Sequence, residues 1–484
     1  MTAGILAYGA YIPRLRLQRQ AIATANTWFN PALKGLAKGE RAICNWDEDT
    51  VTMAVEAARD CLTGIDRKSV RGLQFASTSF PFRDRLNAGI VAEALDIASH
   101  VAALDVTASQ RAATSALLNA LIGGGPTLLI ASEKRRAKTA SPYEMTNGDG
   151  AAAVLVGEGP AIARLVGSAS RTADFVDHYR TDDQPFDYQW EERWIRDEGY
   201  MKLVPPVIAE ALSRAGLQAS DITHFIMPGT LPRIAGTIAK AAGLPETSVR
   251  DNLQAQLGET GVAHPLMLLG HTLEQAKTGD RILVVGFGQG ADAIILEATA
   301  ELAKLPARAG VKGHLARRKE ETSYNRYLAI NDLVEIERGM RSEVDKQTPL
   351  SSLWRNRALL TSFLGGECTK CGTIQIPKSN ICVNPNCNAM HSQVPHAFAD
   401  KAGRINSFTA DRLTFSPSPP ACYGMVQFDG GGRMMLDFTD VDAEALEVGQ
   451  TMRMMFRIKD HDTQRGFTRY FWKAAPAPTS SKES

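Results

Sequence analysis

The sequence has no long apolar run, and none of its apolar stretches approaches the roughly 20 residues that a helix needs to cross a bilayer. The N-terminal stretch Met1–Tyr8 lacks the basic and long apolar segments of a secretory signal peptide. Cysteine is scarce, with seven residues in 484, and four of them cluster late in the chain. This pattern argues against a secreted disulfide framework, so we expect a cytoplasmic protein without membrane contact.

An excess of either charge sign is also absent. Lys and Arg together number 54 and Asp and Glu 53, which gives a net charge of +1. Because there is no basic surplus, we expect neither nucleic acid nor an anionic membrane as a partner. What is present is 44% hydrophobic and 22% charged residues, a composition typical of a globular protein with an ample core. A chain of 484 residues predicts two to four domains.

Strand and helix patterns alternate through the first 304 residues, which predicts a layered α/β core. The alternation occurs twice, so we expect one half at 1–165 and a second, similar half at 166–304. The expected elements include strands at 70–77 and 97–104, helices at 112–121 and 200–215, and a strand, glycine-rich turn and strand at 281–296.

The most informative stretch is Leu104–Ala120, where a strand meets a helix through the small residues of Thr107-Ala108-Ser109-Gln110. Such a corner lifts one side chain to a helix N-terminus, where unpaired N–H groups and the helix dipole favour developing negative charge. A nucleophile or an oxyanion site is expected at such a place. Taken alone, the stretch also fits an ordinary turn that leads a helix into the core.

The spacing from Asp105 through position 110 to Thr114 and Ala116-Leu117 resembles the nucleophile elbow of the thiolase superfamily, and above all of hydroxymethylglutaryl-CoA synthases and the related ketoacyl synthases. The resemblance covers roughly residues 1–300. It implies a duplicated five-layered thiolase-like core, an acyl-CoA or β-keto acid substrate with coenzyme A, and a homodimer. Members of the family carry a cysteine where this chain has Gln110.

Three further catalytic positions of that family differ as well. Its glutamate, histidine and asparagine fall here on Thr78, on Ile226 within Phe225-Ile-Met-Pro, and on Glu259 within Gly258-Glu-Thr. The resemblance therefore does not imply acetyl-cysteine chemistry for this chain. Ala263-His264-Pro265 resembles the Gly-His-Pro of thiolases, whose histidine acts on the thioester carbonyl.

We predict His264, Glu259 and Gln110 as catalytic residues. A histidine titrates near neutral pH and serves as base or electrophile, with Glu259 to orient it. The alternative for His264 is a structural hydrogen bond at a helix start. The amide of Gln110 cannot attack a carbonyl, but its NH₂ group can donate to an enolate or oxyanion. Ser109 as a displaced nucleophile is a minor alternative.

Three functions stay open at this point. In the first, the thiol of coenzyme A attacks a β-keto substrate and cleaves it in a retro-Claisen step. In the second, a decarboxylase or aldolase stabilises a carbanion with Gln110 and backbone N–H groups. In the third, the chain is a catalytically inactive scaffold that binds a true thiolase or another acyl-CoA enzyme. The turn with Gly286, Gly288 and Gly290 lacks the spacing of a dinucleotide fingerprint, and we predict that it lets the backbone approach a substrate thioester.

The character of the sequence changes after residue 304. Residues 305–365 combine a basic stretch with two helical patterns, at 325–342 and 353–363, and are predicted to form a helical connector. Residues 366–392 contain Cys368-Thr-Lys-Cys371 and Cys382-Val-Asn-Pro-Asn-Cys387. Two such pairs about ten residues apart predict a rubredoxin-like zinc ribbon with a structural, four-thiolate site, because four protein ligands leave no open position for catalysis.

Residues 393–475 alternate apolar and polar side chains between Gly, Asp and Pro turns, which predicts a small β-barrel of the OB type. A zinc ribbon followed by such a barrel resembles a module that accompanies thiolase-like enzymes and acts with acyl-CoA. The barrel does not imply nucleic acid here, since it shows no basic excess. Residues 476–484 are predicted to be a disordered tail.

Overall fold

The computed structural model describes residues 3–343 and 347–478. The chain divides into two compact units. The core unit comprises Met1–Asn45, Asp49–Ala92 and Ile97–Leu328, and the C-terminal unit comprises Trp46–Glu48, Glu93–Asp96 and Ala329–Ser484. The predicted connector 305–365 is thus divided between the two units, and most of the predicted tail, 479–484, lies outside the described residues.

One mixed sheet of nine strands organises the core unit, in the order β11-β12-β13-β8-β1-β7-β6-β4-β5. The strands are β1 (Gly4–Tyr11), β4 (Gly72–Ala76), β5 (Ala102–Val106), β6 (Thr127–Glu133), β7 (Gly150–Gly157), β8 (Ala163–Thr172), β11 (His224–Ile226), β12 (Arg281–Phe287) and β13 (Gly290–Ala298). Only two residue pairs, Gly4 with Arg164 and Ile5 with Ala163, join the two halves of this sheet through β1 and β8.

The two halves of the sheet repeat one arrangement of strand directions. In the first half β4 is parallel to β6, and β6-β7-β1 then run antiparallel. In the second half β11 is parallel to β12, and β12-β13-β8 then run antiparallel. The strand that would match β5 is reduced to one parallel bridge between Phe225 and Val249. The duplication expected from the sequence is therefore present, with its second copy shortened by a strand.

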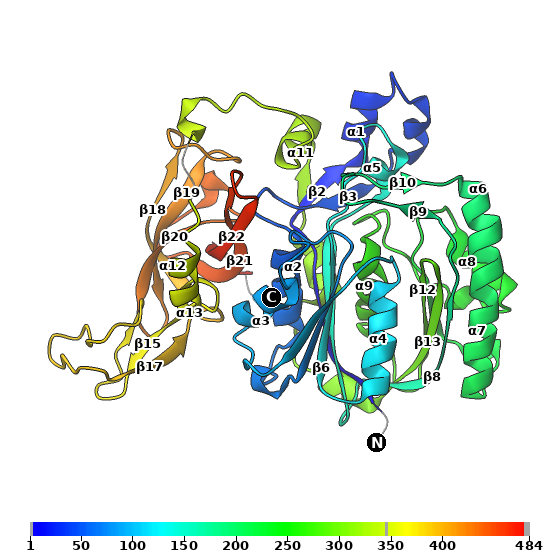
Figure 1. The fold of residues 1–484 in the computed structure, drawn as a ribbon, viewed down its shortest axis with the longest axis horizontal. Coiled ribbons are helices and arrows are strands. Elements are labelled where there is room, and N and C mark those ends of the chain that lie inside the picture. The colour runs from blue at the N-terminus through cyan, green and yellow to red at the C-terminus, as the bar shows by residue number, and fades with distance from the viewer. Residues whose placement is uncertain (1–2, 344–346, 479–484) are drawn as a thin grey trace, which may run out of the picture. The chain divides into compact units, whose positions relative to one another are not determined.

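Two central helices lie between the half-sheets: α4 (Ala112–Gly123) and α9 (His264–Leu273). They contact each other and strands of both halves, and nearly every residue of α9 is buried, as expected for a helix enclosed on all sides. On the outer faces, α2 (Thr50–Cys61) packs on β1 and β7, and α7 (Met201–Ala215) packs on β8 and β13. Figure 1 shows the resulting five layers, helix, sheet, helices, sheet and helix.

Short segments complete the core unit, and two of these helices, 87–94 and 324–330, end in residues of the C-terminal unit. The segments are α1 (Arg19–Asn26), α3 (Asn87–Ala94), α5 (Pro142–Thr146), α6 (Glu192–Trp194), α8 (Ile234–Ala241), α10 (Gly310–Ala316), α11 (Tyr324–Ile330), the sheet of β2 (Leu15–Gln18), β3 (Glu40–Ile43) and β14 (Lys319–Glu321), and the hairpin of β9 (His178–Tyr179) and β10 (Tyr188–Gln189). The expected helix 325–342 ends early, at Ile330. Helix α2 begins at a capping box that Asp49 and Thr52 form.

The C-terminal unit contains two small sheets. The first joins β16 (Ile374–Gln375), β15 (Leu364–Cys368) and β17 (Gln393–Ala397) around the cysteine pairs. The second has the order β20-β19-β18-β21-β22, with β18 (Gly403–Asp411), β19 (Ala421–Phe428), β20 (Arg433–Asp437), β21 (Thr451–Asp462) and β22 (Phe467–Pro476). A bridge from Phe438 to Ala474 joins the first and last strands, which closes the expected barrel. Two short helices, α12 (Leu350–Arg355) and α13 (Arg357–Leu360), precede it.

No helix in the described ranges, 3–343 and 347–478, has both the length and the hydropathy of a membrane span.

Candidate active site and cysteine cluster

The elbow connects β5 to α4, and Gln110 stands two residues before the helix. Ala108 adopts a left-handed backbone, with φ of 73°, which makes the turn sharp. The Ser109 hydroxyl donates to the carbonyl of Gly288 at 3.0 Å. Ser109 is therefore engaged with the second half of the core, and Gln110 is the elbow side chain that lines a cavity.

Arg111 holds the elbow in place. Its guanidinium donates to the carbonyl of Gly288 at 2.9 Å and forms an ion pair with Asp292 at 2.8 Å. Asp292 is fully buried and also accepts hydrogen bonds from Thr114 and Ser115 of α4. A charge buried without partners would be strongly unfavourable, so this network fixes the start of α4 against β13.

The three glycines predicted to bind a cofactor lie against the protein's own chain. A Cβ at Gly286 would come within 2.1 Å of the Thr114 hydroxyl, and one at Gly288 within 2.8 Å of the Ser109 hydroxyl. A Cβ at Gly290 would come within 2.0 Å of the Arg171 carbonyl. Their small size lets the end of β12 and the turn after it pack on the elbow, and Phe287, the last residue of β12, lines the cavity.

Thr78 and Glu133 lie beside Gln110. The Gln110 amide Nε2 donates to the Thr78 hydroxyl at 3.3 Å. The hydroxyl and the backbone N–H of Thr78 in turn donate to the Glu133 carboxylate, at 3.0 and 3.1 Å. Ser77 and Ser79 also donate to Glu133, which is fully buried at the end of β6. Burial raises the pKa of this carboxyl, against the lowering effect of its hydrogen bonds.

A buried ion network begins two residues further along. Arg135 pairs with Asp187 at 2.7 Å and with Glu259 at 3.4 Å, and Arg180 pairs with the other oxygen of Asp187 at 2.7 Å. Burial alone would lower the pKa of Arg135, but Asp187 and Glu259 raise it above its ordinary value. Burial opposes ionisation of Asp187, yet Arg135 and Arg180 hold its pKa below the usual range.

Gln110, Arg135 and Glu259 line a cavity of about 70 Å³. Its lining is Gln110, Arg135, Tyr143, Asp177, His178, Gln189, Ile195, Tyr200, Pro228, Gly229, Thr230, Leu231, Glu259, Gly261, Pro265 and Phe287. This lining contains no cysteine and no serine, so it offers a substrate neither a thiol nor a serine hydroxyl. The mixed polar and aromatic wall is typical of a small-molecule site.

The structure separates the predicted residues. Gln110 and Glu259 both line the cavity, whereas His264 is fully buried and is not part of the lining. The Nδ1 atom of His264 accepts from the Thr260 N–H at 3.0 Å, and its Nε2 lies 2.9 Å from the Asn252 carbonyl. Burial lowers the pKa of this histidine. Its surroundings match the structural alternative considered for it, and its catalytic role stays a prediction.

The two remaining family positions also have definite places. Thr78 contacts Gln110, so it occupies the site without supplying a carboxylate. Ile226 is buried in β11 within the apolar core, and two residues later Pro228 reaches the cavity. The carboxylate nearest Thr78 comes instead from Glu133, on the neighbouring strand.

Sequence reasoning missed Arg135 and the pair Asp177-His178, which line the cavity, and it missed Glu133, which contacts Gln110 through Thr78. His178 lies on β9, and its Nδ1 is 2.8 Å from a carboxylate oxygen of Asp177. One signal was present in the sequence: the buried strand β6 ends directly in Glu133-Lys-Arg-Arg, a charged run at a strand end where polar loop residues often carry function. No comparable signal marks Asp177 or His178.

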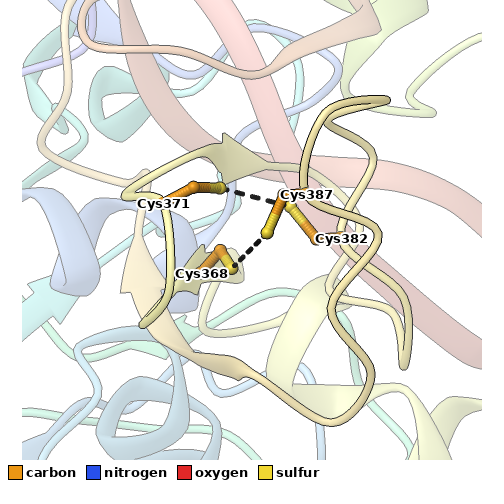
Figure 2. Close-up of side chains that lie close together, drawn as sticks. All are labelled: Cys368, Cys371, Cys382 and Cys387. Atoms are coloured by element: carbon orange, nitrogen blue, oxygen red, sulfur yellow. Dashed lines mark hydrogen bonds between the residues drawn. The ribbon is translucent and has the colours of Figure 1, made fainter.

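The four predicted zinc ligands converge in the C-terminal unit (Figure 2). The sulfurs of Cys368, Cys371, Cys382 and Cys387 all lie within 4.8 Å of one another, and the pairs 371–382 and 368–387 are 3.6 and 3.9 Å apart. Tetrahedral zinc with bonds of about 2.3 Å needs sulfurs about 3.8 Å apart. The donor set therefore fits a zinc ion with four thiolate ligands.

Hydroxyl groups lie next to this cluster. The Ser392 hydroxyl is 3.1 Å from the sulfur of Cys368, and the Thr373 hydroxyl is 3.2 Å from the sulfur of Cys371. Hydrogen bonds to thiolate sulfurs orient metal ligands and disperse their charge.

Comparison with known proteins agrees with both units. Residues 212–297 match the family model described as 3-oxoacyl-[acyl-carrier-protein (ACP)] synthase III C terminal, and residues 397–457 match ChsH2, C-terminal OB-fold domain. The core unit is similar in fold to a crystal structure of HMG-CoA synthase complexed with CoA, with a TM-score of 0.60 and 20% identity over 72% of this chain and 95% of that one. It is also similar to 3-oxoacyl-(acyl carrier protein) synthase III from Pseudomonas aeruginosa, with a TM-score of 0.55 and 22% identity over 62% of this chain and 98% of that one.

Sequence identity is higher to two hydroxymethylglutaryl-CoA synthases than to these two solved structures. The hydroxymethylglutaryl-CoA synthase of Methanosarcina mazei is 29% identical over 340 residues, which span 68% of this chain and 97% of the relative. That of Methanococcoides burtonii is 30% identical over 304 residues, 60% of this chain and 86% of the relative. With this coverage, and with the duplicated core and its elbow in place, the chain belongs to the hydroxymethylglutaryl-CoA synthase family of the thiolase superfamily.

Proposed function

We propose that this protein cleaves β-keto thioesters or β-keto acids by CoA-dependent retro-Claisen acyl transfer, without a covalent acyl-enzyme. The observation that carries the proposal is the composition of the cavity at the elbow. It retains polar groups that can bind a carbonyl oxygen, while its lining includes no cysteine or serine. The relatives named above are hydroxymethylglutaryl-CoA synthases, and a structure similar in fold was solved with CoA, which supports a CoA thioester as the substrate class.

Gln110 has a defined part in this reaction. One N–H of its amide donates to Thr78, which leaves the second N–H for the carbonyl oxygen of a substrate. The thiol of CoA, in place of an enzyme thiol, attacks the β-carbonyl carbon of R–CO–CH₂–CO–SCoA. The α,β carbon–carbon bond then breaks, its electron pair passes to the thioester enolate, and protonation gives R–CO–SCoA and acetyl-CoA. A neutral amide donor lowers the energy of such an oxyanion in a water-poor site.

The other predicted site residues enter the proposal in modified form. Glu259 lines the cavity but shares Arg135 with Asp187, so we assign it to the ion network of the wall. We assign His264 a positioning role, through Thr260 and Asn252, on the loop that carries Glu259. Gly286, Gly288 and Gly290 support the elbow and the wall at Phe287.

We further propose that Cys368, Cys371, Cys382 and Cys387 hold one structural zinc ion. The support is the convergence of their sulfurs and the absence of an open ligand position when all four bind. Zinc there would cross-link the turns that precede β16 and β17, which bury little apolar surface of their own. The homodimer implied by the family resemblance belongs to the same proposal and is tested by light scattering on the purified protein.

The test of the function uses the full-length protein with free CoA and 3-oxoacyl-CoA probes, from acetoacetyl-CoA to 3-oxohexadecanoyl-CoA. We expect the matching shorter acyl-CoA and acetyl-CoA in equal amounts by mass spectrometry, with no acyl adduct in the intact protein mass. Release of CO₂ from a free 3-oxo acid probe would instead identify a decarboxylase, and release of an aldehyde from a 3-hydroxyacyl-CoA probe would identify an aldolase. A complete lack of turnover would favour a binding partner of a true thiolase, and an acylated protein would overturn the non-covalent mechanism.

A further inference from the structure

The pair Asp177-His178 gives the cavity a carboxylate-oriented imidazole. Both residues line the cavity, and their side chains are only 14% and 16% exposed. The 2.8 Å contact engages the Nδ1 atom of His178 with one oxygen of Asp177. Within the described part of the chain, no protein hydrogen bond to the Nε2 atom of His178 is recorded. A histidine held in this way keeps its proton on Nδ1 and presents Nε2 as a base.

Gln289 fixes the second oxygen of Asp177. Its amide Nε2 donates to that oxygen at 3.0 Å, and its side chain extends from the turn between β12 and β13. The backbone of Gln289 is left-handed, with φ of 49°, and its carbonyl accepts from the Arg111 guanidinium at 3.4 Å. The chain of contacts thus runs from the elbow at Arg111 through Gln289 and Asp177 to His178. These contacts therefore connect the position of the His178 imidazole to Arg111, the residue next to Gln110.

The other titratable groups of the lining are less suited to take a proton. Burial raises the pKa of Tyr143 to about 12 and that of Tyr200 higher still, so both stay protonated. Glu259 is paired with the Arg135 guanidinium, which itself remains charged. His178 is therefore the lining residue that combines a basic nitrogen with a position open to the cavity.

We propose that His178 is the general base and acid of the reaction, and that Asp177 and Gln289 position it. This assignment rests on the proposed retro-Claisen function. Nε2 takes the proton of the CoA thiol as sulfur bonds to the β-carbonyl carbon. After the carbon–carbon bond breaks, the imidazolium returns this proton to the α-carbon of the enolate. The proton, the electron pair and both acyl groups are thereby accounted for without an enzyme nucleophile.

The experiment measures kcat/KM against pH for the wild type, His178→Gln, Asp177→Asn and Gln289→Ala, with 3-oxoacyl-CoA and CoA. We expect losses of about 10²- to 10⁴-fold, 10- to 10³-fold and a few-fold, in that order. The acidic limb of the wild-type profile should disappear in His178→Gln, and added imidazole should restore part of the rate to His178→Gly. Asp187, Glu259, Arg135, Tyr143 and Tyr200 face or surround the same space and are unchanged in all variants.

His271→Gln is the matched control, because His271 also pairs with a carboxylate, Glu274 at 3.3 Å, but does not line the cavity. It should keep the wild-type rate, and all variants should share the wild-type melting temperature within a few degrees. Retention of more than half the rate in His178→Gln, or a lack of imidazole rescue, would overturn the role of His178 while the proposed function stands. A wild type that forms no acyl-CoA from any probe would overturn the function, and this inference with it.

Discussion

The cysteine cluster and the cavity at the elbow are assembled from the chain in opposite ways. The four cysteines lie within twenty consecutive residues, 368–387, at the end of β15 and on the turns that follow it. The cavity takes its lining residues from positions 110 to 287, in both halves of the core. The cluster is therefore recognisable from local spacing, whereas the cavity exists only after the duplicated sheet has folded. Four changes test this difference, and we order them from the largest expected effect to the smallest.

Removal of the metal should affect the cysteine cluster most. Apparent zinc binding energies of about 10 kcal/mol or more are typical of four-ligand structural sites. We expect one zinc per chain by elemental analysis, and none in Cys382→Ala. Chelation should abolish the hydrogen-exchange protection of residues 364–397 and leave that of β1, β6 and β7 intact. Cys422→Ala, which removes a buried cysteine outside the cluster, should keep its zinc. Full zinc content in Cys382→Ala would contradict the four-thiolate site.

Removal of Arg135 should damage the cavity next. Arg135→Met leaves Asp187 with Arg180 alone and Glu259 without its cation, so two buried carboxylates lose a partner. Breaking a buried pair in this way costs about 3–5 kcal/mol of the free energy of unfolding, measured by urea titration. Arg164→Met is the control, because its pair with Glu297 is largely exposed and should contribute less than about 1 kcal/mol. Equal losses in both variants would show that the network is not essential to the fold.

Replacement of Gln110 should mainly lower kcat, whereas replacement of His264 should mainly lower the stability of the fold. Gln110→Ala removes an oxyanion donor, and we expect kcat to fall about 10- to 10³-fold with an unchanged melting temperature. His264→Ala leaves the Thr260 N–H and the Asn252 carbonyl without their partner, and each such buried group costs about 1–3 kcal/mol. The second variant should therefore lose stability first. If His264→Ala kept the wild-type stability but lost most of its kcat, His264 would be a catalytic residue after all.

Of the four changes, replacement of Glu133 should have the smallest effect on the free energy of unfolding, and this effect should depend on pH. Because burial raises its pKa in the folded state, the folded protein binds this proton more tightly than the unfolded chain does. Its contribution to stability is thus fully present below the unfolded carboxyl pKa of about 4.3 and is lost as pH rises through the raised folded value. Relative to Glu133→Gln, the wild type should lose up to about 1.4 kcal/mol per pH unit across this window, followed by denaturant unfolding. A pH-independent difference between the two proteins would contradict the assignment.

Local patterns predicted a large part of the fold. The elbow between β5 and α4, the glycine-rich turn between β12 and β13 and the C-terminal barrel were all predicted from short-range sequence. Boundaries were less accurate where a turn replaces regular structure. The strand expected at 97–104 is observed at Ala102–Val106, because the preceding residues form a turn that starts at Asp96, with φ of 53°.

The site was less predictable than the fold. His264 was predicted as catalytic because Ala263-His-Pro resembles a thiolase motif. In the structure, its two ring nitrogens contact Thr260 and Asn252. His178 has no motif around it, and its value as a base depends on Asp177 beside it and Gln289 more than a hundred residues later. The position of Gln110 in the sequence indicated the site but not its neighbours, since Thr78 and Glu133 come from other strands.

The sequence by itself determined the alternation of strands and helices, the missing thiol at position 110 and the spacing of the four cysteines, because these depend on residues that are neighbours in the chain. Tertiary structure alone decided which charged groups meet in the cavity. Whether Glu133 is buried, Arg135 is paired and His178 faces a substrate depends on segments that only the folded sheet brings together. Burial and pairing set the energies of such groups, and neither is a property of the local sequence.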